Sequence, residues 1–348
     1  MDISEFDYEL PSELIAQVPP PVRGSSRLLT LDRQSGRRDH ATIDRLPDLL
    51  RPGDLLVVND SRVFPARLLG ERVPTGGVVE CLLLRRADDD RWDALVHPGQ
   101  KLRPGCRVVF RRAGRELHGE ILERRYYGHR IVRLWTEDHS EVPAAIEAIG
   151  HVPLPPYIRR TDEPADRERY QTVYAREGGS VAAPTAGLHF TPESLEALQA
   201  RGVERVAITL HVGYGTFKPV RVERVEDHTV DPETFTIGEA AAAAINAAVA
   251  EGRRVVAVGT TTTRALESAA RPGGRRVAPT SGRTDLFIHP GFEFRVVGAL
   301  LTNFHLPRSS LLMMVCAFAG RSAVLEAYRE AIERRYRFYS YGDAMLIH

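Results

Sequence analysis

The sequence is poor in cysteine, in long apolar runs and in excess charge of either sign. Its three cysteines, Cys81, Cys106 and Cys316, form no CxxC pair, which argues against a zinc knuckle or a disulfide framework and fits reduced thiols. The longest apolar stretch, LLMMVCAFAG, is shorter than the roughly 20 residues that span a bilayer, so we interpret it as a buried helix. The acidic start, MDISEFDYELP, lacks the pattern of a secretion signal. We therefore expect a cytoplasmic protein with no membrane partner.

The sequence is also poor in lysine. Lysine and arginine together number 47 against 46 acidic residues, so the formal net charge of +1 predicts no global attraction to nucleic acid. Among these bases only Lys101 and Lys218 are lysine. A codon bias toward arginine explains this, yet it leaves many planar, bidentate donors that suit phosphate groups. A neutral total can therefore hide a basic face.

Strand and helix patterns predict an α/β main domain with an inserted small antiparallel β-barrel domain. Residues 65–139 hold six short β runs separated by turn segments such as PTGG, ADDD and HPGQKLRPG, a spacing typical of a small antiparallel barrel. Residues 1–64 and 140–348 mix strands with helices, and we assign them to one discontinuous α/β domain. The barrel is thus predicted to be an insertion.

Local signals predict several helix starts in the main domain. A short helix is expected at 11–17, with Ser12 as its cap. Another is expected from about Arg264, after the turn TTTT, and a late helix, SAVLEAYREAIERRY, with Ser322 as its cap.

The stretch VAAPTAGLHFTPESL (181–195) leads into a further helix. Thr191 is a good N-cap, Pro192 suits the first helical position, and Glu193 favours the positive end of the helix dipole. Gly202 is expected to close the helix. His189, just before the cap, either works at the mouth of a site or only shapes the loop.

Three histidines, His189, His211 and His305, stand at or beyond predicted strand ends, in turns that contain threonine or glycine. Because ligands of open α/β sheets bind beyond the carboxyl ends of strands, these turns predict a shared cleft. The alternative is three unrelated loop histidines. The turn TTTT (260–263) adds hydroxyls and free amides, but neither it nor GYGTF matches a glycine-rich nucleotide fingerprint.

The C-terminal segment RRYRFYSYGDAML mixes arginine with tyrosine and phenylalanine. Interleaved aromatic and arginine side chains suit stacking on nucleic-acid bases. The same pattern is also typical of a C-terminal strand that packs its rings into the core, and the sequence leaves both interpretations open.

Ten ordered blocks between residues 5 and 347 resemble the S-adenosylmethionine:tRNA ribosyltransferase-isomerase family. They are FDYELPSELIAQ, SRLL, LVVNDSRVFPARL, HPGQKLRPG, VAAPTAGLHFT, LHVGYGTFKPV, VGTTTTRALES, TDLFIHPG, LLTNFHLPRSSLLMMVCAFAG and YRFYSYGDAMLI. The resemblance covers essentially the whole chain. It implies an α/β domain with an inserted β-barrel, in agreement with the patterns above.

The resemblance also implies an activity. Such an enzyme moves the ribosyl part of S-adenosylmethionine onto 7-aminomethyl-7-deazaguanine at the wobble position of tRNA and isomerises it, giving epoxyqueuosine with release of adenine and methionine. S-adenosylmethionine is then a ribosyl-donor cosubstrate, no permanently bound cofactor or metal is expected, and the partner is tRNA carrying that base. We expect a monomer.

Placed on these blocks, the residues suggest roles. The sulfonium acidifies the neighbouring sugar carbon, so a base is needed to remove a proton and an acid to help adenine leave. The candidate acid–base residues are His189, His211, His305 and Asp285. The candidate substrate-binding residues are Thr185, Gly187, Gly213, Gly215, Thr260, Thr261, Thr262, Arg264, Glu267, Asn303, Arg308, Tyr339, Tyr341 and Asp343. The candidate tRNA-binding residues are Lys101, Arg103 and Arg62, with Arg85, Arg86, Arg111 and Arg112 as further basic residues of the barrel.

One position departs from the family pattern, because Asp231 stands where the family often has histidine, whereas Glu233 is kept. Any role of that histidine is therefore in doubt in this chain.

Two other functions stay open at this point. A tRNA methyltransferase would also use S-adenosylmethionine but normally carries a glycine-rich cofactor turn, and a non-catalytic tRNA-binding protein would not need three strand-end histidines.

Overall fold

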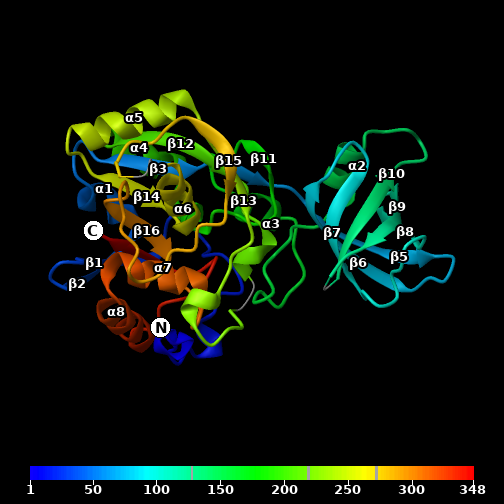
Figure 1. Ribbon diagram of the computed structural model, residues 1–348, viewed down its shortest axis with the longest axis horizontal. Helices are drawn as coiled ribbons and strands as arrows, with labels where there is room; N and C mark the ends of the chain where they lie inside the picture. Colours follow the sequence, from blue (N-terminus) through cyan, green and yellow to red (C-terminus); the bar gives the residue numbers. More distant parts are fainter. Residues whose placement is uncertain (127, 218–219, 271–272) are drawn as a thin grey trace.

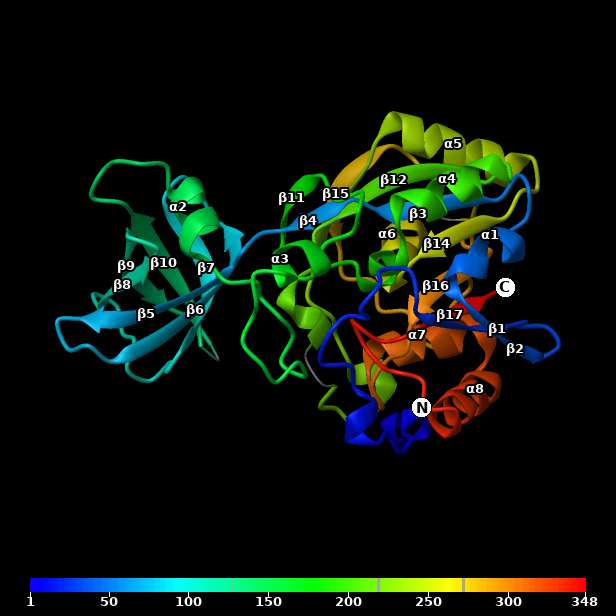
Figure 2. The same cartoon turned by 180° about the vertical axis from the view of Figure 1, so that it is seen from behind.

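The computed structural model describes residues 1–126, 128–217, 220–270 and 273–348, so Lys218 lies outside the described residues. Figures 1 and 2 show a large α/β body with a separate β-barrel standing beside it. This arrangement confirms the predicted fold class.

A mixed sheet forms the centre of the main body. In spatial order its strands are β15 (Thr280–Thr284), β13 (Glu233–Ile237), β12 (Glu204–Leu210), β3 (Leu55–Asn59), β14 (Val255–Val258), β16 (Ala299–Asn303), β17 (Ala344–Ile347), β1 (Arg27–Leu31) and β2 (Arg38–Thr42). Strands β12, β3, β14 and β16 run parallel to one another, so their carboxyl ends meet at one edge.

Helices cover both faces of this sheet because its central strands are buried on both sides. Leu55 and Val57 of β3 face one apolar cluster with α5, α6, α7 and α8, whereas Leu56 and Val58 face a second cluster with α1 and α4. The helices are α1 (Leu46–Leu49), α2 (Val142–Ile149), α3 (Asp166–Arg169), α4 (Pro192–Ala200), α5 (Glu239–Ala250), α6 (Thr260–Ala269), α7 (Ser310–Ala319) and α8 (Arg321–Glu333).

The predicted barrel is closed and antiparallel. Around it the strands are β10 (His129–Trp135), β7 (Arg91–His97), β6 (Val78–Arg86), β5 (Arg67–Val73), β8 (Arg107–Arg112) and β9 (Arg115–Arg124). The chain enters it from β4 (Ser61–Val63), which pairs with β11 (Glu177–Ser180) in the main body. Helix α2 packs on the barrel core through Ala145, Ile146 and Ile149. The domain boundaries stay a proposal, and this packing favours placing the second one after Ile149.

Several helix starts differ from the sequence predictions. The 3₁₀ helix η2 (Ser12–Leu14) replaces the predicted helix at 11–17, and Pro11 precedes it in place of a Ser12 cap. Helix α6 begins at Thr260 and therefore takes in the whole threonine run. Helix α8 follows Gly320, which has a φ of 84°, and Ser322 instead contacts Glu326.

Other local predictions are confirmed. Thr191 caps α4 by accepting from Ser194 N, Pro192 occupies the first turn, and Gly202 follows the helix with a φ of 78°. Helix α7 is buried, and so are the thiols of Cys81 and Cys316. Burial raises the pKa of both thiols to about 12.

Among the described residues, no single helix is long and apolar enough to cross a membrane. Helices α7 and α8 meet that test as a pair bent by 115°.

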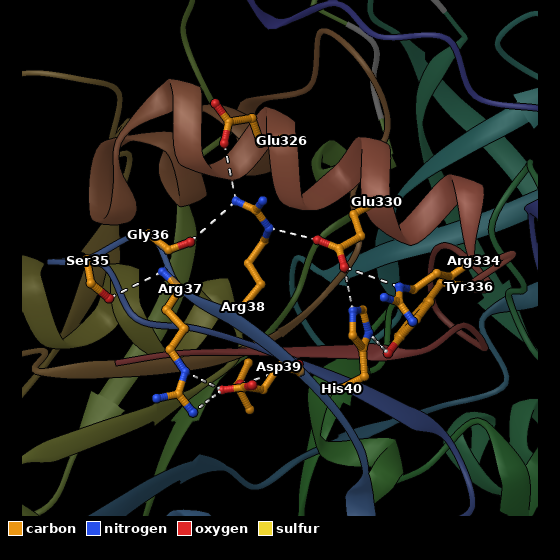
Figure 3. A network of polar contacts seen from close by, with 11 residues as sticks. Ser35, Gly36, Arg37, Arg38, Asp39, His40, Glu326, Glu330, Arg334 and Tyr336 are labelled. Atoms are coloured by element: carbon orange, nitrogen blue, oxygen red, sulfur yellow. Dashed lines mark hydrogen bonds and ion pairs between the residues drawn. The ribbon is translucent and has the colours of Figure 1, made fainter.

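Polar contacts join the edge strand β2 to helix α8 (Figure 3). His40 lies 2.7 Å from both the Tyr336 hydroxyl and a Glu330 carboxylate oxygen, and Arg38 donates to the other oxygen of Glu330 at 2.8 Å. The hydrogen bonds from His40 and Arg38 lower the pKa of Glu330 to about 2. This network holds the edge strand β2 of the sheet against helix α8.

Candidate active site

A cleft lies beyond the carboxyl ends of β12, β14 and β16, where the sequence predicted one. It is lined by four short segments, 182–186, 259–261, 302–305 and 339–340, and by the single residues Tyr157, Val212, Thr216 and Leu311. The cavity volume is about 50 Å³. Ligand pockets usually measure hundreds of cubic ångströms, so a ligand of nucleoside size must move side chains apart as it enters.

The start of helix α6 forms one wall of this cleft. Gly259 precedes the helix with a φ of 90°, a conformation that glycine adopts without strain, and Thr260 and Thr261 then line the cleft. The backbone N–H groups of a helix's first turn lack partners within the helix and suit a polar ligand. By contrast, the fully buried Thr262 donates its hydroxyl to Val258 O, at the end of strand β14, at 2.7 Å. Two of the four threonines therefore line the cleft.

Asn303 forms the floor of the cleft. Its Nδ2 donates to Tyr339 O at 3.0 Å and lies 3.2 Å from His189 Nε2. Its Oδ1 is buried and has no hydrogen-bond partner among the described residues. A buried, unpaired acceptor costs about 1–3 kcal/mol, which a ligand with a donor at that position would recover.

His189 lies behind Asn303 and not in the cleft itself. It ends the 3₁₀ helix η4 (Thr185–His189) and faces a smaller cavity that also contains Tyr341. Burial lowers the pKa of His189 to about 4, so its ring is neutral near pH 7.

His305 does line the cleft. Its Nε2 lies 2.9 Å from the Thr302 hydroxyl, and its backbone N–H donates to the Tyr328 hydroxyl at 3.0 Å. Burial lowers the pKa of His305 to about 3, so this imidazole is also neutral near pH 7. Of the three predicted histidines, His305 is the one in direct reach of a ligand.

A second pocket adjoins the cleft, because Thr216 and Leu311 line both. Its cavity volume is about 30 Å³, and its walls join the apolar Leu286, Phe287 and Met314 to charged groups at one end. There Arg264 donates to Glu233 at 2.7 Å, and both side chains are buried.

The charged end of this second pocket is built by the loop and strands around it. Gly213 N donates to the Glu233 carboxylate at 2.9 Å. Burial raises the pKa of Glu233, although Arg264 and that N–H act in the opposite direction. Gly215 lies so close to Asp231 that a Cβ atom would stand 2.7 Å from its carboxylate. A larger residue at this position would therefore displace the Asp231 side chain.

Tyr339 closes the cleft on the side of the linker. Its ring lies 4.0 Å, centroid to centroid, from that of Tyr157. Tyr339 also has a φ of 73°, which is uncommon for an aromatic residue and stores backbone strain. Such strain is frequent at ligand sites, where the surrounding structure holds it in place.

Several predicted site residues lie outside the cleft and have structural partners. Glu267 accepts hydrogen bonds from the backbone N–H groups of Arg295, Val296 and Val297 at 2.9–3.0 Å. Asp343 accepts hydrogen bonds from the backbone N–H groups of Arg27 and Arg337 and from the Arg27 side chain. Tyr341 donates to Asp166 at 2.8 Å. Arg308 is exposed and forms an ion pair with Asp7. We assign these residues to the framework of the site.

His211, Asp285 and Gly187 are also separated from the cleft. His211 packs against Gly179, and its Nδ1 is buried without a partner among the described residues. Asp285 is exposed. Gly187 is required by packing, because a Cβ atom there would stand 2.3 Å from the Tyr174 hydroxyl.

The predicted tRNA-binding residues are on the surface. Lys101, Arg103 and Arg62 are exposed, the first two on the barrel and the third in β4. The four further candidates of the barrel already have partners: Arg85 contacts Asp93, Arg86 contacts Asp88 O and Asp89, Arg111 contacts Glu71 and Glu116, and Arg112 donates to Gly150 O. Charge alone therefore does not identify the tRNA face.

Sequence reasoning missed Tyr157, Ser340, Thr216 and Leu311 as lining residues of the two pockets. Thr216 and Ser340 stood inside blocks of the family resemblance, which could have indicated them. Tyr157 arrives from a proline-rich linker with no local sign of function. In the described part of the chain, no group of three or more His, Cys, Asp and Glu residues is placed to hold a metal ion.

Comparison with known proteins identifies the family. A family model described as queuosine biosynthesis protein matches residues 3–347. The S-adenosylmethionine:tRNA ribosyltransferase-isomerase of Symbiobacterium thermophilum is 54% identical over 348 residues, 100% of both chains, and that of Desulfitobacterium hafniense is 51% identical over 347 residues, also 100% of both. A crystal structure of the S-adenosylmethionine tRNA ribosyltransferase from Thermotoga maritima is 40% identical, covers 99% of this chain and 100% of its own, and gives a TM-score of 0.57. This chain therefore belongs to the S-adenosylmethionine:tRNA ribosyltransferase-isomerase family of queuosine biosynthesis.

Proposed function

We propose that this chain transfers the ribosyl part of S-adenosylmethionine to 7-aminomethyl-7-deazaguanine at the tRNA wobble position and isomerises it, giving epoxyqueuosine-tRNA. Adenine and methionine leave, and S-adenosylmethionine is consumed as a cosubstrate in place of a resident cofactor. The observation that carries the proposal is the cleft at the carboxyl ends of β12, β14 and β16, where a helix start, an unpaired amide oxygen and a neutral histidine converge.

The adenosyl part belongs in this cleft. The hydroxyls and first-turn N–H groups of Thr260 and Thr261 suit ribose hydroxyls, and the unpaired Oδ1 of Asn303 suits a donor such as the exocyclic amine of adenine. Tyr157 and Tyr339 offer aromatic faces at the same entrance. The small volume of the cleft implies that this tyrosine pair opens when the substrate enters.

The methionine part belongs in the adjoining pocket. Its apolar walls, including Leu286 and Met314, match the methylene and S-methyl groups, and its charged end matches an amino-acid head group. Glu233 already neutralises the charge of Arg264, so the pair offers the ligand no net positive charge. We therefore assign the pair to orienting the head group by hydrogen bonds.

His305 is the acid–base group that the geometry favours. Its ring is neutral and can accept the proton that the sulfonium makes acidic on the neighbouring sugar carbon, and because burial disfavours the imidazolium, that cation readily returns a proton to departing adenine. The amine of the tRNA base then attacks the opened sugar and methionine departs with the sulfur electron pair. His189 acts through Asn303 as a positioning residue.

Product analysis tests the function. The protein is incubated with S-adenosylmethionine and tRNA bearing the aminomethyl base, and the small molecules and digested nucleosides are measured by mass. Ribosyl transfer yields adenine, methionine and a heavier nucleoside, whereas S-adenosylhomocysteine would indicate a methyltransferase and unchanged nucleosides a binding protein.

A pair of variants tests the assignment of His305. His305→Gln should slow adenine release by about 10²–10⁴-fold, the usual contribution of one acid–base group. His211→Gln, outside the cleft, serves as the matched control and should stay within threefold of the wild type. Equal effects of the two substitutions would overturn the assignment.

A further inference from the structure

A hollow of about 560 Å³ lies between the barrel and the linker 153–161. It borders the cleft directly. Tyr157 and Ala182 line the cleft, whereas their chain neighbours Ile158 and Val181 line the hollow. A single layer of chain therefore separates the two spaces.

One side of the hollow is apolar. Leu82, Leu95 and Val96 contribute from barrel strands β6 and β7, and the linker contributes Leu154 and three prolines at 153, 155 and 156. Flat, rigid apolar surface of this kind suits the face of a nucleobase. The cavity volume also lies within the range of ordinary ligand pockets.

The basic side chains that line the hollow divide into two groups. Arg67 pairs with Glu80 at 2.8 Å, and Arg160 makes a bidentate pair with Asp166 at 2.6 and 2.8 Å, so both arginines are neutralised. The exposed side chains of His97 and Arg159 make no hydrogen bond or ion pair within the described part of the chain. One comes from the barrel and the other from the linker, so they flank the hollow from both bodies.

The loop after His97 is held in a defined shape. The buried Arg130 donates to the carbonyl oxygens of Gly99 and Leu102, which fixes the segment that carries Lys101. Arg103 is exposed immediately beyond it. Unpaired basic side chains therefore continue from the hollow along this loop.

We propose that this hollow receives one unstacked nucleotide of the tRNA anticodon loop, next to the base that enters the cleft. The base lies against the proline and leucine wall, and the flanking phosphates face His97 and Arg159. The proposal rests on the proposed function, which requires one base of a folded RNA to leave its stack and reach a buried site. It also gives the inserted barrel a function, since strands β5, β6 and β7 of the barrel supply one side of the hollow.

Direct tRNA binding tests this proposal without requiring turnover. Arg159→Ala and His97→Ala are compared with Arg115→Ala, an exposed barrel arginine that does not line the hollow. Arg159→Ala should raise the Kd for tRNA about tenfold and reduce the salt slope of binding by about 1, because one phosphate contact is lost. Arg115→Ala should change neither quantity.

Leu154→Glu, which places a carboxylate in the hollow, provides a second test. It should weaken tRNA binding more than Arg159→Ala does and leave the KM for S-adenosylmethionine within twofold. Unchanged tRNA binding in all these variants would overturn the proposal, and so would a rise in the KM for S-adenosylmethionine alone, which would assign the hollow to the small substrate. If the wild-type protein bound tRNA as described but released no adenine, the proposed function would fail while the hollow would still bind RNA.

Discussion

The orientation of the Asn303 carboxamide and the protonation of the His189 imidazole are coupled through one hydrogen bond. Asn303 Nδ2 donates to Tyr339 O, which can only accept, so the amide orientation is determined. Its second N–H then points to His189 Nε2 at 3.2 Å, which must be an unprotonated acceptor. This agrees with a His189 pKa lowered to about 4, and it leaves Asn303 Oδ1 as a buried acceptor without a partner among the described residues.

Replacing His189 by Ala should therefore reduce kcat/KM for adenine release by about 10–100-fold, the equivalent of one mispositioned hydrogen bond at 1.4 kcal/mol per tenfold. The loss should be equal at pH 6 and pH 8, because His189 is neutral throughout that range. His189→Gln, which can still accept from Asn303, should recover part of the activity. Unchanged turnover in a folded His189→Ala protein would reduce this residue to a loop-shaping role.

The threonine run offers a matched comparison within one helix. Thr261→Val removes a hydroxyl that lines the cleft and should raise the KM for S-adenosylmethionine about 5–12-fold, since a ligand hydrogen bond contributes about 1–1.5 kcal/mol. Thr262→Val removes a hydroxyl bonded to Val258 O and should leave that KM unchanged. Steady-state kinetics distinguishes the two, and equal effects would contradict the geometry of α6.

Glu267→Gln should affect stability more than binding. The carboxylate accepts three backbone N–H groups, and glutamine would set an amide N–H₂ against one of them. The free energy of unfolding should fall by about 1–3 kcal/mol, as measured by urea titration. The KM for S-adenosylmethionine should stay within twofold. A large rise in that KM with unchanged stability would instead support the sequence prediction that Glu267 contacts substrate.

Stability should fall as the pH drops from 7 to 5. In the folded chain His189 and His305 stay neutral down to about pH 4 and 3, whereas in the unfolded chain they take up protons near the ordinary pKa of 6.5. The unfolded state therefore binds more protons in this window, and each histidine lowers the free energy of unfolding by on the order of 1–2 kcal/mol at pH 5. Thermal melts should show a shallower pH dependence in His305→Gln, and an unaltered slope would contradict the buried neutral state.

Several features of this protein were predictable because their signals are local. Six β runs with turn residues between them predicted the barrel, and the strand-end position of His305 predicted its place in the cleft. The direction of side chains was not predictable. His211 also follows a strand end, yet its N–H pairs with Thr234 O of the neighbouring strand and its ring packs on Gly179.

Contacts between residues far apart in the chain could not be predicted from the sequence either. Tyr157 reaches the cleft because the linker is anchored by the Arg160–Asp166 pair, and Asp166 in turn accepts from Tyr341, 175 residues away in the chain. No periodic pattern encodes such a contact. The edge strand β2 was missed for a related reason, since its exposed residues lack apolar alternation and it is held by contacts with α8 (Figure 3).

Amide hydrogen exchange with and without S-adenosylmethionine tests the central claim most directly, because it locates the ligand on the unmodified protein. The first-turn N–H groups of α6 should become protected when the adenosyl part binds, together with segments 182–186 and 302–305. Protection at the opposite edge of the sheet, or none in these three segments at saturating ligand, would contradict the assignment of this cleft to ribosyl transfer.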